Sequence, residues 1–180
     1  MILKNIENFI LVAVTVMLLS ACGTTSMTKA GGGVSEVYEV HHEGRIHVFY
    51  DRKLYTDFLK LGETPYRLTR IGAGPNNETL VFGLTKKDKK KRSGIPVVDL
   101  FDGKAKPAED FYAEMVKHGR IYIFDNFDDM KTVRDFGHPN YQYSMIGAGP
   151  NGETLVFVLN KQNKKKRPTG LIKKYEQHHS

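Results

Sequence analysis

Two stretches near the start of the chain are rich in branched and aromatic residues and alternate with polar ones, as β-strands do. They are residues 37–41 and 45–50, and we expect them to form a hairpin. A three-residue loop, His42-Glu43-Gly44, would place both sets of apolar side chains on one face. That face would carry Tyr38, Val40, Ile46 and Val48. The other face would carry Glu39, His41, Arg45, His47 and Phe49.

A helix is expected next, because apolar residues then recur at helical spacing. They are Leu54, Tyr55, Phe58, Leu59 and Leu61. Asp51 is a suitable N-cap, and Gly62 stands where a left-handed C-cap belongs. Two more strands are predicted at residues 66–71 and 79–84, joined by a turn that contains Gly-Pro-Asn-Asn. The order is therefore strand, strand, helix, strand, strand.

The same pattern occurs a second time, 75 positions later. Residues 71–84 read IGAGPNNETLVFGL, and residues 146–159 read IGAGPNGETLVFVL. Between residues 39–92 and 114–167, 24 of the 54 aligned pairs are identical, far more than chance would give. The sequence therefore predicts an α+β fold with two tandem ββαββ repeats, antiparallel sheets and pseudo-symmetry. One such unit has a thin core, so we expect the two to pack into a single compact body.

The first 22 residues form a separate segment. An apolar run from Phe9 to Leu19 is too short to span a bilayer and suits a signal peptide. It ends in Leu19-Ser20-Ala21-Cys22, which closely resembles the lipobox of bacterial lipoproteins. The resemblance implies cleavage between Ala21 and Cys22 and attachment of fatty acyl chains, such as palmitate, to Cys22. Because Gly23 and not Asp follows the cysteine, the resemblance also implies export to the outer membrane, facing the periplasm.

These assignments divide the chain into six parts. We expect a signal peptide at 1–21, an acylated start and flexible tether at 22–35, and repeat 1 at 36–92. A connector follows at 93–110, in which residues 97–101 are a candidate strand, then repeat 2 at 111–168 and a polar tail at 169–180. Cys22 is the sole cysteine of the sequence, so no disulfide can form within the chain.

Charge points to an anionic partner. The formal net charge is +7, and basic residues gather after the last strand of each repeat. The candidate binding residues are Lys89, Lys90, Lys91, Arg92, Lys164, Lys165, Lys166 and Arg167. They could bind an anionic lipid or an envelope glycan, or they could be ordinary solvated loops. The inferred periplasmic location makes nucleic acid an unexpected partner.

Three other patterns are weaker. Two histidines, His41 and His47, with Glu39 nearby are weak metal-ligand candidates, but repeat 2 has Val116 and Tyr122 in place of the histidines. Asp125, Asp128 and Asp129 lack the alternating ligands of a calcium loop and fit a helix N-terminus. The IGAGPN motif precedes a strand, whereas a phosphate-binding glycine loop opens a helix. His178 and His179 fall in the tail, for which disorder is expected.

Catalytic patterns are not found: no Gly-x-Ser-x-Gly elbow and no His-Glu-x-x-His is present. We therefore expect a non-enzymatic, membrane-anchored envelope lipoprotein that acts as a binding or adaptor module, with no cofactor. Its partner would be an envelope protein or an anionic glycan or lipid. The alternative is a carrier of a metal or small ligand on the hairpin face with His41, His47 and Arg45. An envelope hydrolase is a third hypothesis.

Overall fold

The computed structural model describes residues 33–180. The expected signal peptide and Cys22 lie outside the described residues. The described residues belong to one compact unit. It is a mixed α/β fold that contains a single eight-stranded sheet and four helices.

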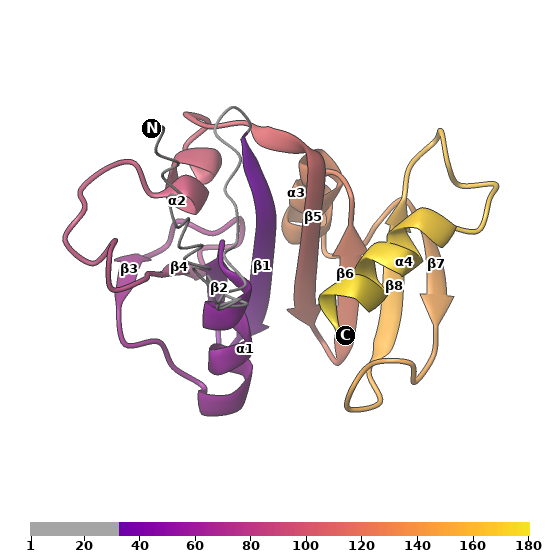
Figure 1. Cartoon of the computed structure of the whole chain (residues 1–180), viewed down its shortest axis with the longest axis horizontal. Helices are drawn as coiled ribbons and strands as arrows, with labels where there is room; N and C mark the ends of the chain where they lie inside the picture. Colours follow the sequence, from indigo (N-terminus) through magenta and orange to yellow (C-terminus); the bar gives the residue numbers. More distant parts are fainter. Residues whose placement is uncertain (1–32) are drawn as a thin grey trace, which may run out of the picture. The chain divides into compact units, whose positions relative to one another are not determined.

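The strands follow the order β3-β4-β2-β1-β5-β6-β8-β7 across the sheet (Figure 1). Their bounds are β1 Val34–His42, β2 Arg45–Phe49, β3 Arg67–Arg70, β4 Thr79–Gly83, β5 Pro107–Lys117, β6 Arg120–Phe124, β7 Tyr141–Met145 and β8 Thr154–Leu159. The helices are α1 Arg52–Leu61, α2 Pro96–Phe101, α3 Phe127–Phe136 and α4 Thr169–His178. The other predicted strands are present within a residue or two, but β1 begins at Val34, inside the expected tether, and β5 begins at Pro107, inside the expected connector.

The expectation of purely antiparallel sheets is wrong, because the sheet is mixed. Strands β1 and β5 pair in parallel at its centre, as do β2 with β4 and β6 with β8. The hairpin pairs β1–β2 and β5–β6 and the edge pairs β3–β4 and β7–β8 are antiparallel. Each parallel pair joins strands that other elements separate along the chain, as parallel pairing requires.

The predicted register of the first hairpin is also wrong. His42 pairs with Arg45, so the loop has two residues, Glu43 and Gly44. Both have positive φ, 49° and 70°, as a type I′ turn needs. Ile46 and Val48 therefore lie on the opposite face from Tyr38 and Val40, since side chains alternate along a strand. This register is stable because both faces of the sheet are buried.

Each face of the sheet is covered by two helices. Helices α2 and α3 pack on one face, which we call face A, against residues that include Ile46, Phe82 and Met115. Helices α1 and α4 pack on the other, face B, against residues that include Tyr38, Ile123 and Phe157. Figure 1 shows α4 in front of the sheet and α3 behind it. Each face thus carries one helix from each half of the chain.

The helix caps agree with the sequence pattern. The Asp51 carboxylate accepts from the Leu54 amide at 2.9 Å, and the Asn126 side chain accepts from Asp128 and Asp129 at 2.8 and 3.2 Å. Gly62 and Gly137 adopt the left-handed conformation after α1 and α3. Asp128 and Asp129 lie in the first turn of α3, where their negative charges interact favourably with the positive end of the helix dipole.

Two segments differ from expectation. The candidate strand at 97–101 is helix α2, with proline at its start and Val97, Val98 and Leu100 buried on face A. The expected tail at 169–180 is largely helix α4, which buries Leu171, Ile172 and Tyr175 on face B. In both cases tertiary burial of a short apolar stripe decides the structure, a factor that local propensity does not include.

Candidate functional site

The basic run after β4 is held in place by a buried aspartate. Asp88 is 5% exposed and accepts hydrogen bonds from the hydroxyls of Tyr50 and Thr85 and from the Lys91 ammonium, the last at 2.6 Å. Burial alone would raise the pKa of the Asp88 carboxyl, but Lys91 and the two hydroxyls outweigh burial and lower it. Burial and Asp88 raise the pKa of Tyr50 to about 12. These bonds fix the loop after β4 to the edge of the hydrophobic core.

The basic run after β8 is pinned by neutral amides. Asn163 stands 75 positions after Asp88, and its side chain accepts from the Asn160 amide at 2.8 Å. The Asn160 side chain accepts from the Gln162 amide at 3.0 Å. In both runs the eight candidate binding residues, 89–92 and 164–167, are exposed. Fixed loops thus present these cations to solvent.

A lysine of each run lies over a tyrosine of the neighbouring edge. The Lys89 ammonium is 4.8 Å from the centroid of the Tyr66 ring, and the Lys164 ammonium is 4.1 Å from that of Tyr141. Lys164 also donates to the Tyr141 hydroxyl at 3.0 Å and lowers the pKa of that phenol. These are cation–π pairs, and the two pairs are 75 positions apart in sequence.

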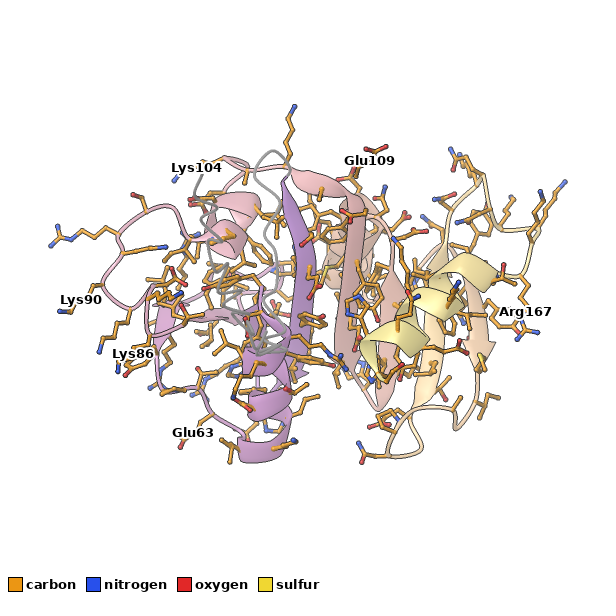
Figure 2. All side chains as sticks on the ribbon, in the orientation of Figure 1. Glu63, Lys86, Lys90, Lys104, Glu109 and Arg167 are labelled. Carbon is orange, nitrogen blue, oxygen red and sulfur yellow. The ribbon has the colours of Figure 1, made fainter. Side chains whose placement is uncertain are left out.

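A shallow surface hollow accompanies each tyrosine–lysine pair. The first has a volume of about 340 Å³ and is lined by Pro65, Tyr66, Arg67, Leu84 and Lys89. The second, of about 510 Å³, includes Asn140, Tyr141, Leu159 and Lys161, at or near the corresponding positions, together with residues of α3. The edge strands β3 and β7 place them at opposite ends of the strand order. In Figure 2, Lys86 and Lys90 lie on one side of the molecule and Arg167 on the other.

The chemistry of the hollows favours an anionic oxygen. The first is lined by two cationic residues and no acid. The second contains Asp129, whose carboxyl has its pKa raised by burial. Because the Tyr141 oxygen accepts from Lys164, its own hydrogen stays free to donate to a ligand. A phosphate, sulfate or carboxylate group could thus be bound between the phenol and the lysines.

The two candidate metal ligands of the first hairpin point to opposite faces. His41 pairs with Ile46 on face A, whereas His47 pairs with Val40 on face B. His47 packs on Phe58, with ring centroids 4.4 Å apart, and burial lowers its pKa to about 4. The predicted shared face is therefore wrong. Among residues 33–180, no group of three or more His, Cys, Asp or Glu is placed to hold a metal ion.

A buried ion pair lies under α3. Glu39 is fully buried on face A, and its carboxylate accepts from the guanidinium of Arg134, with the Nε atom at 2.8 Å. Its other oxygen contacts His41 at 3.2 Å. Burial alone would raise the pKa of Glu39, but Arg134 and His41 outweigh it and lower the pKa. The guanidinium in turn lies over the Phe101 ring at 4.2 Å.

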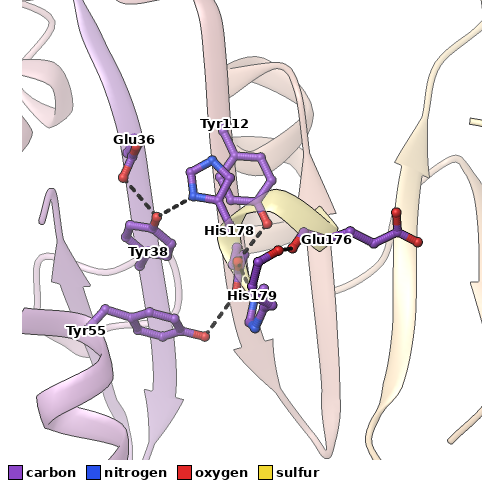
Figure 3. A network of polar contacts seen from close by, with 9 residues as sticks. Glu36, Tyr38, Tyr55, Tyr112, Glu176, His178 and His179 are labelled. Carbon is purple, nitrogen blue, oxygen red and sulfur yellow. Dashed lines mark hydrogen bonds and ion pairs between the residues drawn. The ribbon is translucent and has the colours of Figure 1, made fainter. Parts of the chain in front are cut away.

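A second buried glutamate, Glu114, lies on face B. Figure 3 shows its neighbours Tyr55, Tyr112 and His179 close together. Its carboxylate accepts from the hydroxyls of Tyr112 at 2.6 Å and Tyr55 at 3.2 Å, and contacts His179 at 2.9 Å. His178 stacks on Tyr112 with 3.9 Å between centroids, and burial lowers its pKa. Disorder was expected for the two tail histidines, but both are ordered and contact Glu114 or its partner Tyr112.

Sequence reasoning did not single out the two buried glutamates as a pair. Glu39 and Glu114 are 75 positions apart and identical, within strands whose neighbours are mostly apolar. A repeated acid in a buried strand was the available signal. Their partners differ, because Arg134 corresponds to Leu59 and Tyr55 to Met130. Each glutamate bonds to a side chain from the helix of the other half of the chain.

Comparisons with protein families, with curated proteins and with solved structures found no match. None of the helices within residues 33–180 combines the length and the apolar character that a bilayer crossing requires.

Proposed function

We propose that this protein is a lipid-anchored envelope lipoprotein whose folded part is a non-enzymatic binding module for an anionic partner. The lipobox-like sequence Leu19-Ser20-Ala21-Cys22 supports the anchor. The first strand begins at Val34, twelve positions after Cys22 (34 − 22). Acyl chains on Cys22 would hold the module at the membrane. The lipobox resemblance implies that this is the outer membrane, with the module facing the periplasm.

We further propose that the module consists of two copies of one unit, and that each copy includes the helix that follows its last strand. Helices α2 and α4 occupy corresponding places in the element order. The observation that carries the functional proposal is the recurrence of one surface feature. In each half a hollow is lined by a tyrosine and a leucine, Tyr66 with Leu84 and Tyr141 with Leu159. A lysine lies over each tyrosine, Lys89 over Tyr66 and Lys164 over Tyr141.

The partner class follows from charge and location. Eight exposed cations in two pinned loops favour a polyanion over a single small ion. In the envelope, the polyanions are glycans with acidic groups and acidic protein surfaces. The buried glutamates do not suggest a hydrolase, because both have hydrogen-bond partners and lie beneath helices. The alternative, a carrier of a metal or small ligand, required His41 and His47 on one face of the hairpin, and they lie on opposite faces.

Crosslinking in intact cells tests this proposal. A photoreactive residue replaces Arg92 or Arg167, at the end of each basic run, in the otherwise native lipoprotein. The matched control keeps the photoreactive residue at the same position and replaces the remaining residues of 89–92 and 164–167 with glutamine. Recovery of one envelope glycan or protein that the control loses supports the proposal. Equal recovery from the lipoprotein and its glutamine control contradicts the proposal. A lipoprotein that has Cys22 intact but is absent from the membrane fraction also contradicts it.

A further inference from the structure

One end of the sheet carries four loops and lies opposite the start of β1. Strands β1 and β5 are parallel, so their hairpin turns, 43–44 and 118–119, lie at the same end. The loops 71–78 and 146–153 end beside these turns, because Thr79 pairs with Arg45 and Thr154 with Arg120. In Figure 1, β1 and β5 both point toward this end. We call it the loop end.

The two long loops of the loop end have the same braced conformation. The Glu78 carboxylate accepts from the Asn76 amide at 2.7 Å, and Glu153 accepts from Asn151 at 2.8 Å. Gly74 and Gly149 approach these glutamates so closely that a Cβ would lie 2.7 or 2.6 Å from the carboxylate. These contacts explain the glycines, the asparagines and the glutamates that recur in both loops.

They do not explain the isoleucine that opens each loop. Ile71 is 89% exposed and Ile146 is 90% exposed, so neither contributes to a core. Other exposed positions have changed between the halves: Leu61 corresponds to Phe136, Lys60 to Asp135 and Glu43 to His118. A rigid loop that holds an identical apolar side chain in water twice points to a contact with something apolar.

Two arginines accompany the isoleucines. Arg45 and Arg120 are exposed, are identical between the halves, and lie beside the loops through their pairing with Thr79 and Thr154. The six residues Ile-Gly-Ala-Gly-Pro-Asn of each loop carry no charge. Apolar tips next to guanidinium groups match a phospholipid interface, where acyl chains lie below a layer of phosphates.

We propose that the loop end is a bilayer contact, in which Ile71 and Ile146 enter the acyl region and Arg45 and Arg120 bind lipid phosphates. The loops join opposite edge pairs of the sheet, six strand spacings or roughly 29 Å apart. A protein partner would need two pockets at that separation, whereas a bilayer offers the same apolar layer at both points. The basic loops then face away from the membrane, toward an envelope polyanion.

The chain before β1 is long enough for this orientation. Val34 starts β1 at the end opposite the loop end, and the nine residues of β1 span about 30 Å. Residues 22–33 can extend to at most about 40 Å. An anchor at Cys22 therefore permits the loop end to reach the same bilayer. Two isoleucines alone bind a bilayer weakly, and attachment to the membrane raises their effective concentration.

The experiment uses residues 23–180, which include the compact unit with both apolar cores. A histidine tag before residue 23 keeps the length of chain ahead of β1 and attaches the protein to vesicles of phosphatidylethanolamine and phosphatidylglycerol that contain a nickel-chelating lipid. The test therefore does not depend on acylation. Cys22 is the sole cysteine of the sequence, so Ile71→Cys or Ile146→Cys supplies a unique thiol for an environment-sensitive fluorophore. Lys104→Cys and Glu109→Cys are the controls, since both positions are exposed and lie at the end of the molecule opposite the loop end (Figure 2).

Labels at 71 and 146 should be quenched by spin-labelled lipid, and their quenching by aqueous iodide should fall about threefold on attachment. Labels at 104 and 109 should remain in water. Replacing Arg45 and Arg120 with glutamine should reduce the lipid quenching at 71 and 146. Labels at all four positions that behave alike, or no lipid quenching at 71 and 146, would overturn the bilayer contact. Neither result bears on the crosslinking test of the basic loops.

Discussion

Arg134→Leu removes the positive charge that compensates the buried Glu39 carboxylate. Leucine is the residue that the first half of the chain has at the corresponding position, 59. Glu39 is fully buried, and the Arg134 side chain is 8% exposed. Removing one partner of such a pair leaves an uncompensated charge in a medium of low polarity. We expect Arg134→Leu to lower the free energy of unfolding by about 3–5 kcal/mol at neutral pH.

The size of this loss should depend on pH. In the native protein the pKa of Glu39 is lowered, so its stabilising contribution is present above the ordinary glutamate pKa and is lost as pH falls through the lowered value. Without Arg134, burial raises the pKa of Glu39, and the carboxyl can become neutral at mild acidity. The difference between variant and native protein should therefore shrink as pH falls from 7 toward 4.

Urea denaturation at several pH values, followed by circular dichroism, measures the effect. The second variant, Glu39→Leu with Arg134→Leu, removes both charges and should recover most of the stability, because apolar pairs often replace buried ion pairs without loss. A loss below about 1 kcal/mol for Arg134→Leu at neutral pH, or a loss that grows as pH falls, would refute this reasoning.

Three further predictions follow from packing and hydrogen bonds. Tyr55→Phe removes a hydroxyl that donates to buried Glu114 and should cost about 1–2 kcal/mol in urea denaturation; no change would mean that water replaces the bond. Asn126→Ala removes the N-cap of α3 and should cost about 1 kcal/mol, measured as a lower thermal midpoint. Gly83→Ala places a Cβ 2.5 Å from the Phe49 ring and should cost about 1–3 kcal/mol, whereas an unchanged midpoint would show that the ring moves freely.

Local chemistry predicted much of the secondary structure. The N-caps Asp51 and Asn126 and the C-caps Gly62 and Gly137 are where hydrogen bonding and positive φ require them. The strand limits at residues 45–50 and 79–84 agree within a residue with β2 and β4. These features depend on neighbouring residues alone, so the sequence pattern is sufficient to locate them.

The hairpin register and the parallel pairs depend on parts of the chain that are far apart. The predicted hairpin register assumed that one face of the sheet is exposed to solvent. Under that assumption, a face that carries both the apolar Tyr38 and the polar His47 is unfavourable. Helices from both halves cover both faces, and Glu39 finds Arg134, 95 positions away. Neither the partner nor the covering helix can be read from the alternation along a single strand.

The candidate site was predicted in part. The basic runs were identified from composition, and the structure adds the tyrosines beneath Lys89 and Lys164 and the pinning of each loop. Tyr66 and Tyr141 are identical between the halves, but only the fold brings them to the lysines, 23 positions later in sequence (89 − 66 and 164 − 141). The metal-ligand prediction has the wrong geometry, because the two-residue turn places His41 and His47 on opposite faces.

The most direct test of the account is the number of anion sites and their independence. Sucrose octasulfate serves as the probe in a calorimetric titration of residues 31–180. We predict two sites, with Lys89→Gln plus Tyr66→Phe removing one, Lys164→Gln plus Tyr141→Phe removing the other, and the combined variant binding none. A single site, or a titration that all of these variants leave unchanged, would contradict the claim that the two hollows bind anions.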